Sequence, residues 1–207
     1  KELWRLNSEE ACNHGTRIHE SMERYTKEFK ISESDNDLAP VIKEVCQDYI
    51  EYKKTYDEIC LYHPDYFVAG TADKLLVTKA KAGIIDIEDY KTNRGGIHFH
   101  NDYNKYMKGP VSHLQQCSYN RYSLQESIYG VMYEALTGHK IRKCWIRYIS
   151  EVKDVNDKVI GFKQERIAVP YMKLEALAVL EYYHTSKNIT TFEKQEVLSL
   201  EQIPNFD

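Results

Sequence analysis

The chain has 207 residues, of which 42% are hydrophobic and 29% charged, a composition typical of a soluble globular protein with a real core. It has no apolar run near the ~20 residues of a membrane helix, and its first fifteen residues lack the apolar segment of a signal peptide. Five scattered cysteines without a CxxC pair argue against a zinc site or a disulfide framework, so we expect a reducing, cytoplasmic compartment.

The net charge of −4 is unevenly distributed along the chain. Residues 91–147 carry nine Lys and Arg against three acids, a local charge of +6, so the remainder carries −10. A basic middle beside an acidic remainder suits a protein that meets a polyanion such as DNA on one face. On charge alone, an unevenly charged solvated surface is an equally good interpretation.

Two helices are expected at the start of the chain. Residues 8–29 form the first, with Ser8 as its N-cap and Gly15 as its weak point. A polar loop follows at residues 32–37, and apolar residues on one side predict a second helix over residues 38–56. Because Lys1 is not a natural start, we also expect residues upstream of it.

The pattern then changes to strands. Residues 58–77 and 82–92 are β-rich runs, joined by "TKAKAG" as a plausible hairpin. A loop rich in Gly, Asn and His occupies residues 93–110. A long helix is expected over residues 111–137, closed by Gly138.

The last part of the chain predicts two strands and a helix. The strands are "KCWIRYISEV" and "VIGFKQERIAV" with "KDVNDK" as their turn, and the helix covers residues 170–185. The tail over residues 186–207 is polar and expected to be loosely held. These elements predict one α/β domain over residues 1–207, with a core at roughly 8–185 and helices packed on a sheet.

Charged residues at one strand end carry the candidate chemistry. Asp89 and Lys91 alternate with Tyr90 and therefore share one face of a strand, and the hairpin brings Asp73 beside Asp89. Two converging carboxylates repel unless a cation lies between them. The lysine can orient or deprotonate a water molecule and balance developing phosphate charge.

Four further acids lie close to this motif. The Pro64–Asp65 dipeptide is assigned to a turn, where Pro-Asp is common. Asp86 and Glu88 fall on either side of the Asp89 register. Glu88 should face away with Tyr90, and both acids are interpreted as groups on the outer face or behind the site. Glu58 could approach from the first strand, but we favour a solvated acid.

The order "GTAD", then "DYKT" after an apolar strand, resembles the PD-(D/E)XK nuclease superfamily, and its RecB-type exonuclease branch in particular. The upstream segment "GTRIHESME" resembles the branch's helix that supplies a metal-ligating histidine, here His19. The segment "YSLQESIYGVMYEALTG" resembles its Q-x-x-x-Y helix, with Gln125 and Tyr129. Gln115 and Tyr119 have the same spacing and remain an alternative.

The resemblance implies a restriction-endonuclease-like α/β core, a mixed sheet of about four or five strands flanked by helices. It implies Asp73, Asp89 and Lys91 as catalytic residues, and Mg²⁺ or Mn²⁺ held by the two aspartates, His19 and the Tyr90 carbonyl. The residues expected to bind the DNA substrate are Thr92, Arg94, Gln125 and Tyr129.

The activity implied is a deoxyribonuclease, most readily an exonuclease, with roles in DNA recombination or repair and a phage or mobile-element origin by analogy. Two alternatives stay open: an endonuclease of the same fold, and a nuclease-fold module that binds DNA without cleaving it. Some helicase-fused and CRISPR-adaptation members of the branch that the chain resembles carry an iron–sulfur cluster held by one early and three late cysteines. No such cluster is expected here, because no cysteine follows Cys144 to supply the late ones. No P-loop is present, so a helicase or recombination partner would be a separate chain.

Overall fold

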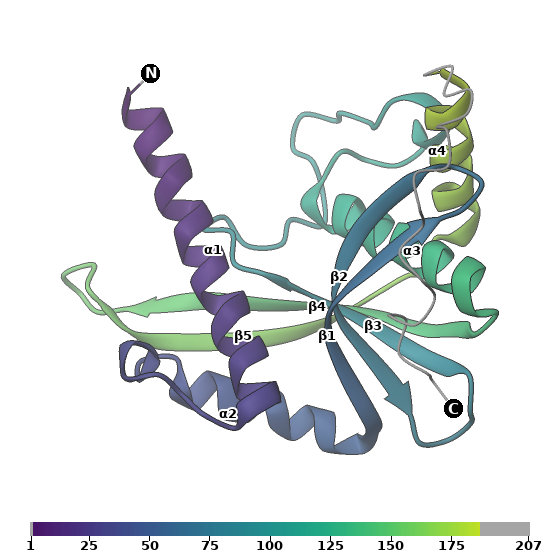
Figure 1. The fold of residues 1–207 in the computed structure, drawn as a ribbon. Helices are drawn as coiled ribbons and strands as arrows, with labels where there is room; N and C mark the ends of the chain where they lie inside the picture. The colour runs from purple at the N-terminus through teal and green to yellow at the C-terminus, as the bar shows by residue number, and fades with distance from the viewer. Residues whose placement is uncertain (1, 187–207) are drawn as a thin grey trace.

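A five-stranded mixed sheet with helices on both faces forms the framework of the chain (Figure 1). The structure, a computed structural model, describes the backbone of residues 2–186 and the side chains of residues 9–186. The α/β class and the mixed sheet flanked by helices are as the sequence predicted. The predicted tail, residues 186–207, lies outside the described residues except for Ser186.

The strands lie in the sheet in the order in which they follow one another along the chain. All neighbours are antiparallel except β3 and β4, which are parallel and are joined by the long helix α3. A parallel pair needs such a crossover, whereas antiparallel pairs can be joined by short turns. The strands are β1 (Tyr52–His63), β2 (Val68–Thr78), β3 (Ile84–Lys91), β4 (Lys140–Lys153) and β5 (Val159–Val169).

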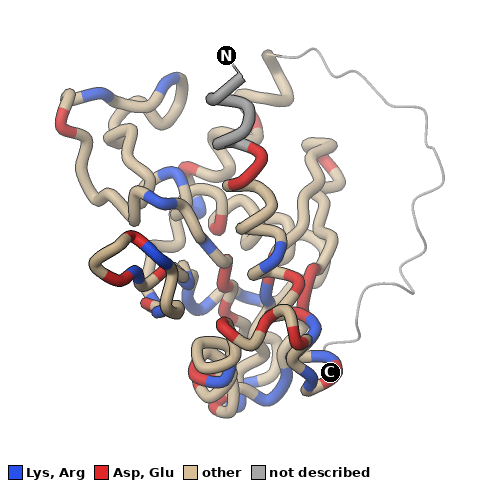
Figure 2. The backbone as a smooth tube through the Cα atoms, turned by 90° about the vertical axis from the view of Figure 1, so that its left-hand side faces the viewer, with Lys and Arg blue, Asp and Glu red and all other residues tan. Residues whose placement is uncertain are grey.

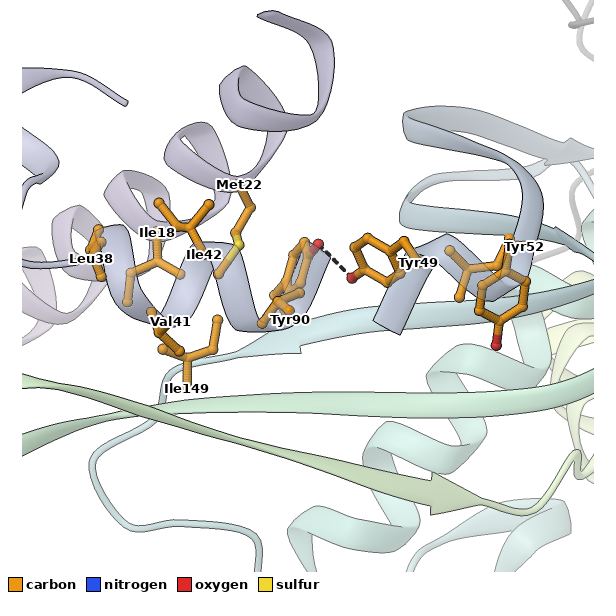
Figure 3. Packing of buried hydrophobic residues seen from close by; sticks show 11 residues of the cluster. Ile18, Met22, Leu38, Val41, Ile42, Tyr49, Tyr52, Tyr90 and Ile149 are labelled. Carbon is orange, nitrogen blue, oxygen red and sulfur yellow. Dashed lines mark hydrogen bonds between the residues drawn. The ribbon is translucent and has the colours of Figure 1, made fainter. Parts of the chain in front are cut away.

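One face of the sheet is covered by α1 (Glu2–Glu28) and α2 (Ala39–Asp48). Ile18 and Met22 lie one turn apart on α1, so both point at α2 and the sheet. Figure 3 shows them packed with apolar residues of α2 and with Tyr90 of β3. This packing fixes α1 across the sheet close to the end of β3.

The other face is covered by α3 (Ser118–Thr137), on which α4 (Lys173–Ser186) packs. Met132 and Tyr133 of α3 are buried against leucine and isoleucine side chains of β2 and β3. Gly138 ends the helix in the left-handed conformation, with φ of 71°, as its position in the sequence predicted. None of the helices within residues 2–186 combines the length and apolar character needed to cross a bilayer.

Several boundaries differ from those expected. The first helix begins at Glu2, so Ser8 lies inside it and is not its N-cap, and the helix continues through Gly15. The second helix ends at Asp48, because residues from Tyr52 onward pair with β2 instead. The run 58–77 is two strands, separated by the turn that contains Asp65.

Two other helices start later than expected. The helix expected from residue 111 begins at Ser118, after a short 3-10 turn at Gly109–Val111, and the last helix begins at Lys173. The polar loop at 32–37 contains another 3-10 turn, Glu33–Asp35. Asp35 is buried there because Arg17 and Arg24 of α1 donate hydrogen bonds to it. These boundaries depend on contacts made far along the chain.

A buried ion-pair network lies between β3 and the strands β4 and β5. Glu88 is completely buried and accepts hydrogen bonds from Arg147 at 3.0 Å and Arg166 at 2.7 Å. Asp86, also buried, accepts two from Arg142 at 2.7 and 2.8 Å. Glu88 thus faces away from Asp89 on the same side as Tyr90, as expected, whereas the expectation of an outer, solvated position is wrong for both acids. They are structural groups whose charges are compensated inside the α1/α2 layer.

Removing one partner of this network should destabilise the fold strongly. Arg147 is completely buried between Glu88, Asp48 and Gln164. Arg147→Ala leaves the Glu88 charge with less compensation, and breaking a buried pair in this way costs about 3–5 kcal/mol. Urea unfolding followed by circular dichroism measures the loss. Lys158→Ala, in the exposed β4–β5 turn, is the control and should change stability by less than ~0.5 kcal/mol.

Candidate functional site

Asp73 and Asp89 meet at the same end of the β2–β3 hairpin. The ladder pairs Lys74 with Glu88, which brings Asp73 opposite Asp89 in the next step of the register. The backbone N–H of Tyr90 donates a hydrogen bond of 2.8 Å to Asp73 Oδ2. The hairpin thus brings the two carboxylates together, as the strand alternation predicted.

Lys91 completes the strand motif. Its Nζ lies 2.5 Å from Asp89 Oδ2 and donates a hydrogen bond of 3.2 Å to Gln125 Oε1. The same Gln125 donates to Asp89 Oδ1 at 3.4 Å, and the ring of Tyr122 lies 4.7 Å from Lys91 Nζ. Helix α3 therefore fixes both members of the Asp89–Lys91 pair through one amide side chain.

Helix α1 brings His19 to this point. Its Nδ1 lies 3.5 Å from Asp73 Oδ2, and its ring contacts the Tyr90 ring edge-on at 5.5 Å between centroids. The backbone of Tyr90 is also a hydrogen-bond partner of His19. The Tyr90 phenol points away into the core, where it bonds the Tyr49 hydroxyl at 2.9 Å (Figure 3).

Glu58 joins the site as well. Ligand atoms of His19, Glu58 and Asp73 all lie within 4.8 Å of one another. Glu58 is exposed, as expected of a solvated acid, but the β1–β2 register brings it opposite Asp73. It adopts a left-handed backbone conformation with φ of 52°, which is uncommon for a residue other than glycine and often marks a functional position. Glu58 therefore approaches the site from the first strand, the possibility that we ranked second, while its side chain is also exposed.

The electrostatics of the site reflect burial and crowding of like charges. Burial, followed by the nearby Asp89 charge, raises the pKa of Asp73 to about 8. Burial also raises the pKa of Asp89, although Lys91 opposes this effect. Burial would lower the pKa of Lys91, but the Asp89 carboxylate outweighs it and raises that pKa, so Lys91 is protonated at neutral pH. Burial lowers the pKa of His19, which favours the neutral imidazole.

Glu126 is a further member that sequence reasoning missed. It follows Gln125 on α3 and is completely buried. Burial and then the Asp89 charge raise its pKa well above the ordinary range, which favours the protonated carboxyl. Its only sequence signal is an acid within the apolar part of an expected helix, a position where carboxylates are rarely buried without a partner.

Of the residues expected to bind substrate, Gln125 and Tyr129 lie together on α3, where Gln125 Nε2 donates to the Tyr129 hydroxyl at 3.1 Å. Gly70 makes room for this tyrosine, since a Cβ there would lie 2.8 Å from its ring. The alternative pair lies elsewhere: Gln115 forms a β-bridge with the preceding loop, and the Tyr119 ring stacks on Phe99.

Thr92 and Arg94 lie on the loop that follows β3. They border a pocket shared with His14 of α1 and Tyr148 of β4. The Arg94 guanidinium lies 3.4 Å from Glu10 of α1, so part of its charge is directed to the helix. These two residues therefore extend the site along the side of α1.

The donor set fits a small divalent cation. Mg²⁺ and Mn²⁺ favour carboxylate oxygens, and Mn²⁺ also accepts a neutral imidazole, the form that burial favours for His19. Burial and the adjacent Asp89 charge raise the pKa of Asp73 and so disfavour its carboxylate form in the absence of a further positive charge. A cation held by His19, Glu58 and Asp73, next to Asp89, would supply a compensating positive charge.

Comparison with known proteins adds little to this geometry. No protein-family model matches the chain, and no curated protein matches it. Among solved structures, the chain is similar to a Eubacterium rectale protein named "Putative exonuclease", at 13% identity and a TM-score of 0.46. That similarity covers 90% of this chain and 77% of the other. It is a distant likeness.

Proposed function

We propose that the chain is a divalent-metal-dependent deoxyribonuclease of the PD-(D/E)XK superfamily, of RecB type, which hydrolyses DNA phosphodiester bonds as an exonuclease. One observation carries the proposal: Asp73, Asp89 and Lys91 converge with His19 and Glu58 from four separate elements, α1, β1, β2 and β3. Structural carboxylates in this chain have their charges compensated by arginines, as Asp86 and Glu88 do. Asp73 has no such arginine partner among residues 9–186, as expected of a carboxylate whose charge is compensated by a bound metal ion.

In this proposal His19, Glu58, Asp73 and Asp89 hold Mg²⁺ or Mn²⁺. When bound, the ion supplies Lewis-acid stabilisation of phosphate charge and lowers the pKa of a water molecule. The neutral imidazole of His19 leaves a ring nitrogen free to act as a ligand. The Tyr90 N–H holds one oxygen of Asp73 in a fixed direction.

Lys91 acts as a cation in this proposal. The Asp89 carboxylate raises its pKa against the effect of burial, which favours the protonated form over one that would take a proton from water. Lys91 instead donates hydrogen bonds to a phosphate oxygen and balances the charge that develops there. Gln125 holds the Lys91 ammonium in place, and Thr92, Arg94 and Tyr129 contact the DNA backbone.

The first test is removal of the strand motif. Asp89→Ala and Lys91→Ala should each reduce cleavage by ~10²-fold or more, because each group acts on charge at the reacting phosphate. End-labelled linear DNA and closed circular DNA, incubated with Mn²⁺ with and without EDTA, provide the assay. Asp65→Ala, in the β1–β2 turn, is the control and should retain activity.

The wild-type enzyme should degrade the linear DNA and leave the circle intact. Cleavage of the circle would identify an endonuclease of the same fold. Full activity in Asp89→Ala, at an unchanged circular dichroism spectrum, would contradict the active-site assignment.

The second test concerns the choice of metal. If the His19 imidazole is a ligand, Mn²⁺ should support cleavage at least as well as Mg²⁺. His19→Ala should lose the preference for Mn²⁺ and require a higher concentration of either ion for cleavage. Glu58→Gln should also require a higher concentration of both ions, but should keep the preference for Mn²⁺. Metal titrations of the cleavage rate measure both effects. His113→Ala, an exposed histidine that faces Glu175, is the control, and a His19→Ala titration that coincides with it would remove His19 from the site.

The third test uses pH. Asp73 has a pKa of about 8 in the folded chain against 3.8 for an ordinary aspartate, so between these values the folded state holds a proton that the unfolded state has released. The free energy of unfolding of the metal-free protein should therefore fall as pH rises from about 4 to about 8. Mn²⁺ should raise the melting temperature more at the alkaline end, because the metal competes with this proton.

Thermal melts across this pH range, with EDTA or with Mn²⁺, give the comparison. Asp73→Asn has no such proton and should lose less stability as the pH rises. Parallel melting curves for the wild type and Asp73→Asn would show that Asp73 is not the group responsible.

A further inference from the structure

The basic segment 91–147 does not form a continuous cationic face. Figure 2 shows basic and acidic residues interspersed over most of the backbone. Five of the nine cations in this segment are paired with carboxylates: Lys91, Arg94, Lys140, Arg142 and Arg147. Within residues 9–186 the other four have no carboxylate partner, and they are Lys105, Lys108, Arg121 and Lys143.

Two of these unpaired cations line one pocket, and a third lies beside it. The pocket has a volume of about 270 Å³ and lies between the loop that precedes α3 and α3 itself. It contains an aromatic ring, apolar side chains, an amide, two cations and no acid. Its lining residues are Tyr106, Met107, Lys108, Gln116, Arg121 and Leu124.

The loop that forms this pocket is held in shape by its own hydrogen bonds. The Asn101 side chain donates to the Gln116 carbonyl at 2.7 Å and accepts from the Tyr103 N–H at 2.9 Å. Two further backbone bonds of 2.9 Å, Met107 to Leu114 and Gln116 to Lys105, close the loop on itself. A ligand would therefore meet a preformed surface, which reduces the entropic cost of binding.

Aromatic rings on this loop point to solvent. Tyr103 is 81% exposed and Tyr106 is 48% exposed, although large rings normally bury most of their area. The ammonium of Lys105 lies 5.4 Å from the centre of the Tyr103 ring. Exposed rings interleaved with unpaired cations are the combination by which proteins bind single-stranded nucleic acid, since bases stack on the rings and phosphates meet the cations.

We infer that this pocket binds one nucleotide of a single DNA strand, with its base stacked on Tyr106 and its phosphate at Lys108 and Arg121. The inference rests on the proposed function and names a binding subsite for it. Arg121 precedes Gln125 by four residues on α3, so their Cα atoms are separated by about 6 Å along the helix. Because Gln125 contacts both Asp89 and Lys91, a DNA strand bound in the pocket could continue along α3 to the Asp89–Lys91 pair. The volume, just below the ~300 Å³ of small-molecule sites, suits one nucleotide unit.

The pocket bordered by His14, Thr92 and Arg94 has a different character. There, the Glu151 carboxylate lies 3.8 Å from the Lys153 ammonium, so these two charges compensate one another, and His14 lies 3.7 Å from the same carboxylate. A polyanion gains less at such a surface than at one whose cations are free. The contrast favours the pocket beside Arg121 as the place where the strand is held.

Binding of a short fluorescein-labelled oligothymidylate, measured by anisotropy with Ca²⁺ in place of Mn²⁺, tests the inference. Tyr106→Ala should weaken binding about 5- to 150-fold, the range of one lost stacking contact of ~1–3 kcal/mol. Tyr106→Trp should bind at least as well as the wild type. Arg121→Gln should reduce the slope of log affinity against log salt by about 0.7, the value for one phosphate on a single strand.

Matched controls are Phe29→Ala, an exposed ring at the far end of α1, and Lys158→Gln in the β4–β5 turn. Cleavage with Mn²⁺ is measured on the same proteins. If the wild type cleaves and Tyr106→Ala and Arg121→Gln bind like the controls, the subsite is overturned while the proposed function stands. If the wild type binds the oligonucleotide through Tyr106 but never cleaves DNA, the proposed nuclease function is overturned while the binding subsite stands. Loss of self-association in Tyr106→Ala, with unchanged oligonucleotide affinity, would assign the surface to a second protein copy and also overturn the subsite.

Discussion

Strand β3 is buried on both faces, yet it carries three carboxylates, and this constraint shapes the rest of the molecule. A buried carboxylate must be neutralised by a counter-charge, a proton or a metal. Because successive residues point to opposite faces, Asp86 and Glu88 enter the α1/α2 layer, where arginines of β4 and β5 compensate them. Asp89 enters the α3 layer, where Lys91 is its cation partner.

The α3 side of β3 is therefore under-compensated in charge. Asp73 lies beside Asp89, and the fully buried Glu126 lies beneath them, so one lysine faces three acids. Burial first, and then the nearby Asp89 charge, raise the pKa values of both Asp73 and Glu126. Helix α1 is fixed by its own packing on α2, and it places His19 beside Asp73, where the two side chains could hold a cation together. The core that fixes the helices thus also fixes the distances within the candidate site.

Much of this arrangement could be predicted from the sequence, because it depends on local periodicity. Alternation along β3 and the "TKAKAG" turn predicted that Asp73 and Asp89 meet, and β5 matches its predicted run, Val159–Val169. The rest depends on long-range contacts. The approach of Glu58 depends on a β1 strand that begins inside an expected helix, and the burial of Asp86 and Glu88 depends on arginines about 60 to 80 residues downstream.

The central claim is that the carboxylates of β2 and β3 hold a divalent cation together with His19. Anomalous X-ray scattering from crystals soaked in Mn²⁺ tests it most directly, because it locates the ion independently of activity. The account predicts a manganese peak within coordination distance of Asp73 and His19, about 2.0–2.3 Å from their ligand atoms. Well-ordered crystals that contain no manganese at Asp73, at a concentration at which the enzyme is fully active, would contradict it.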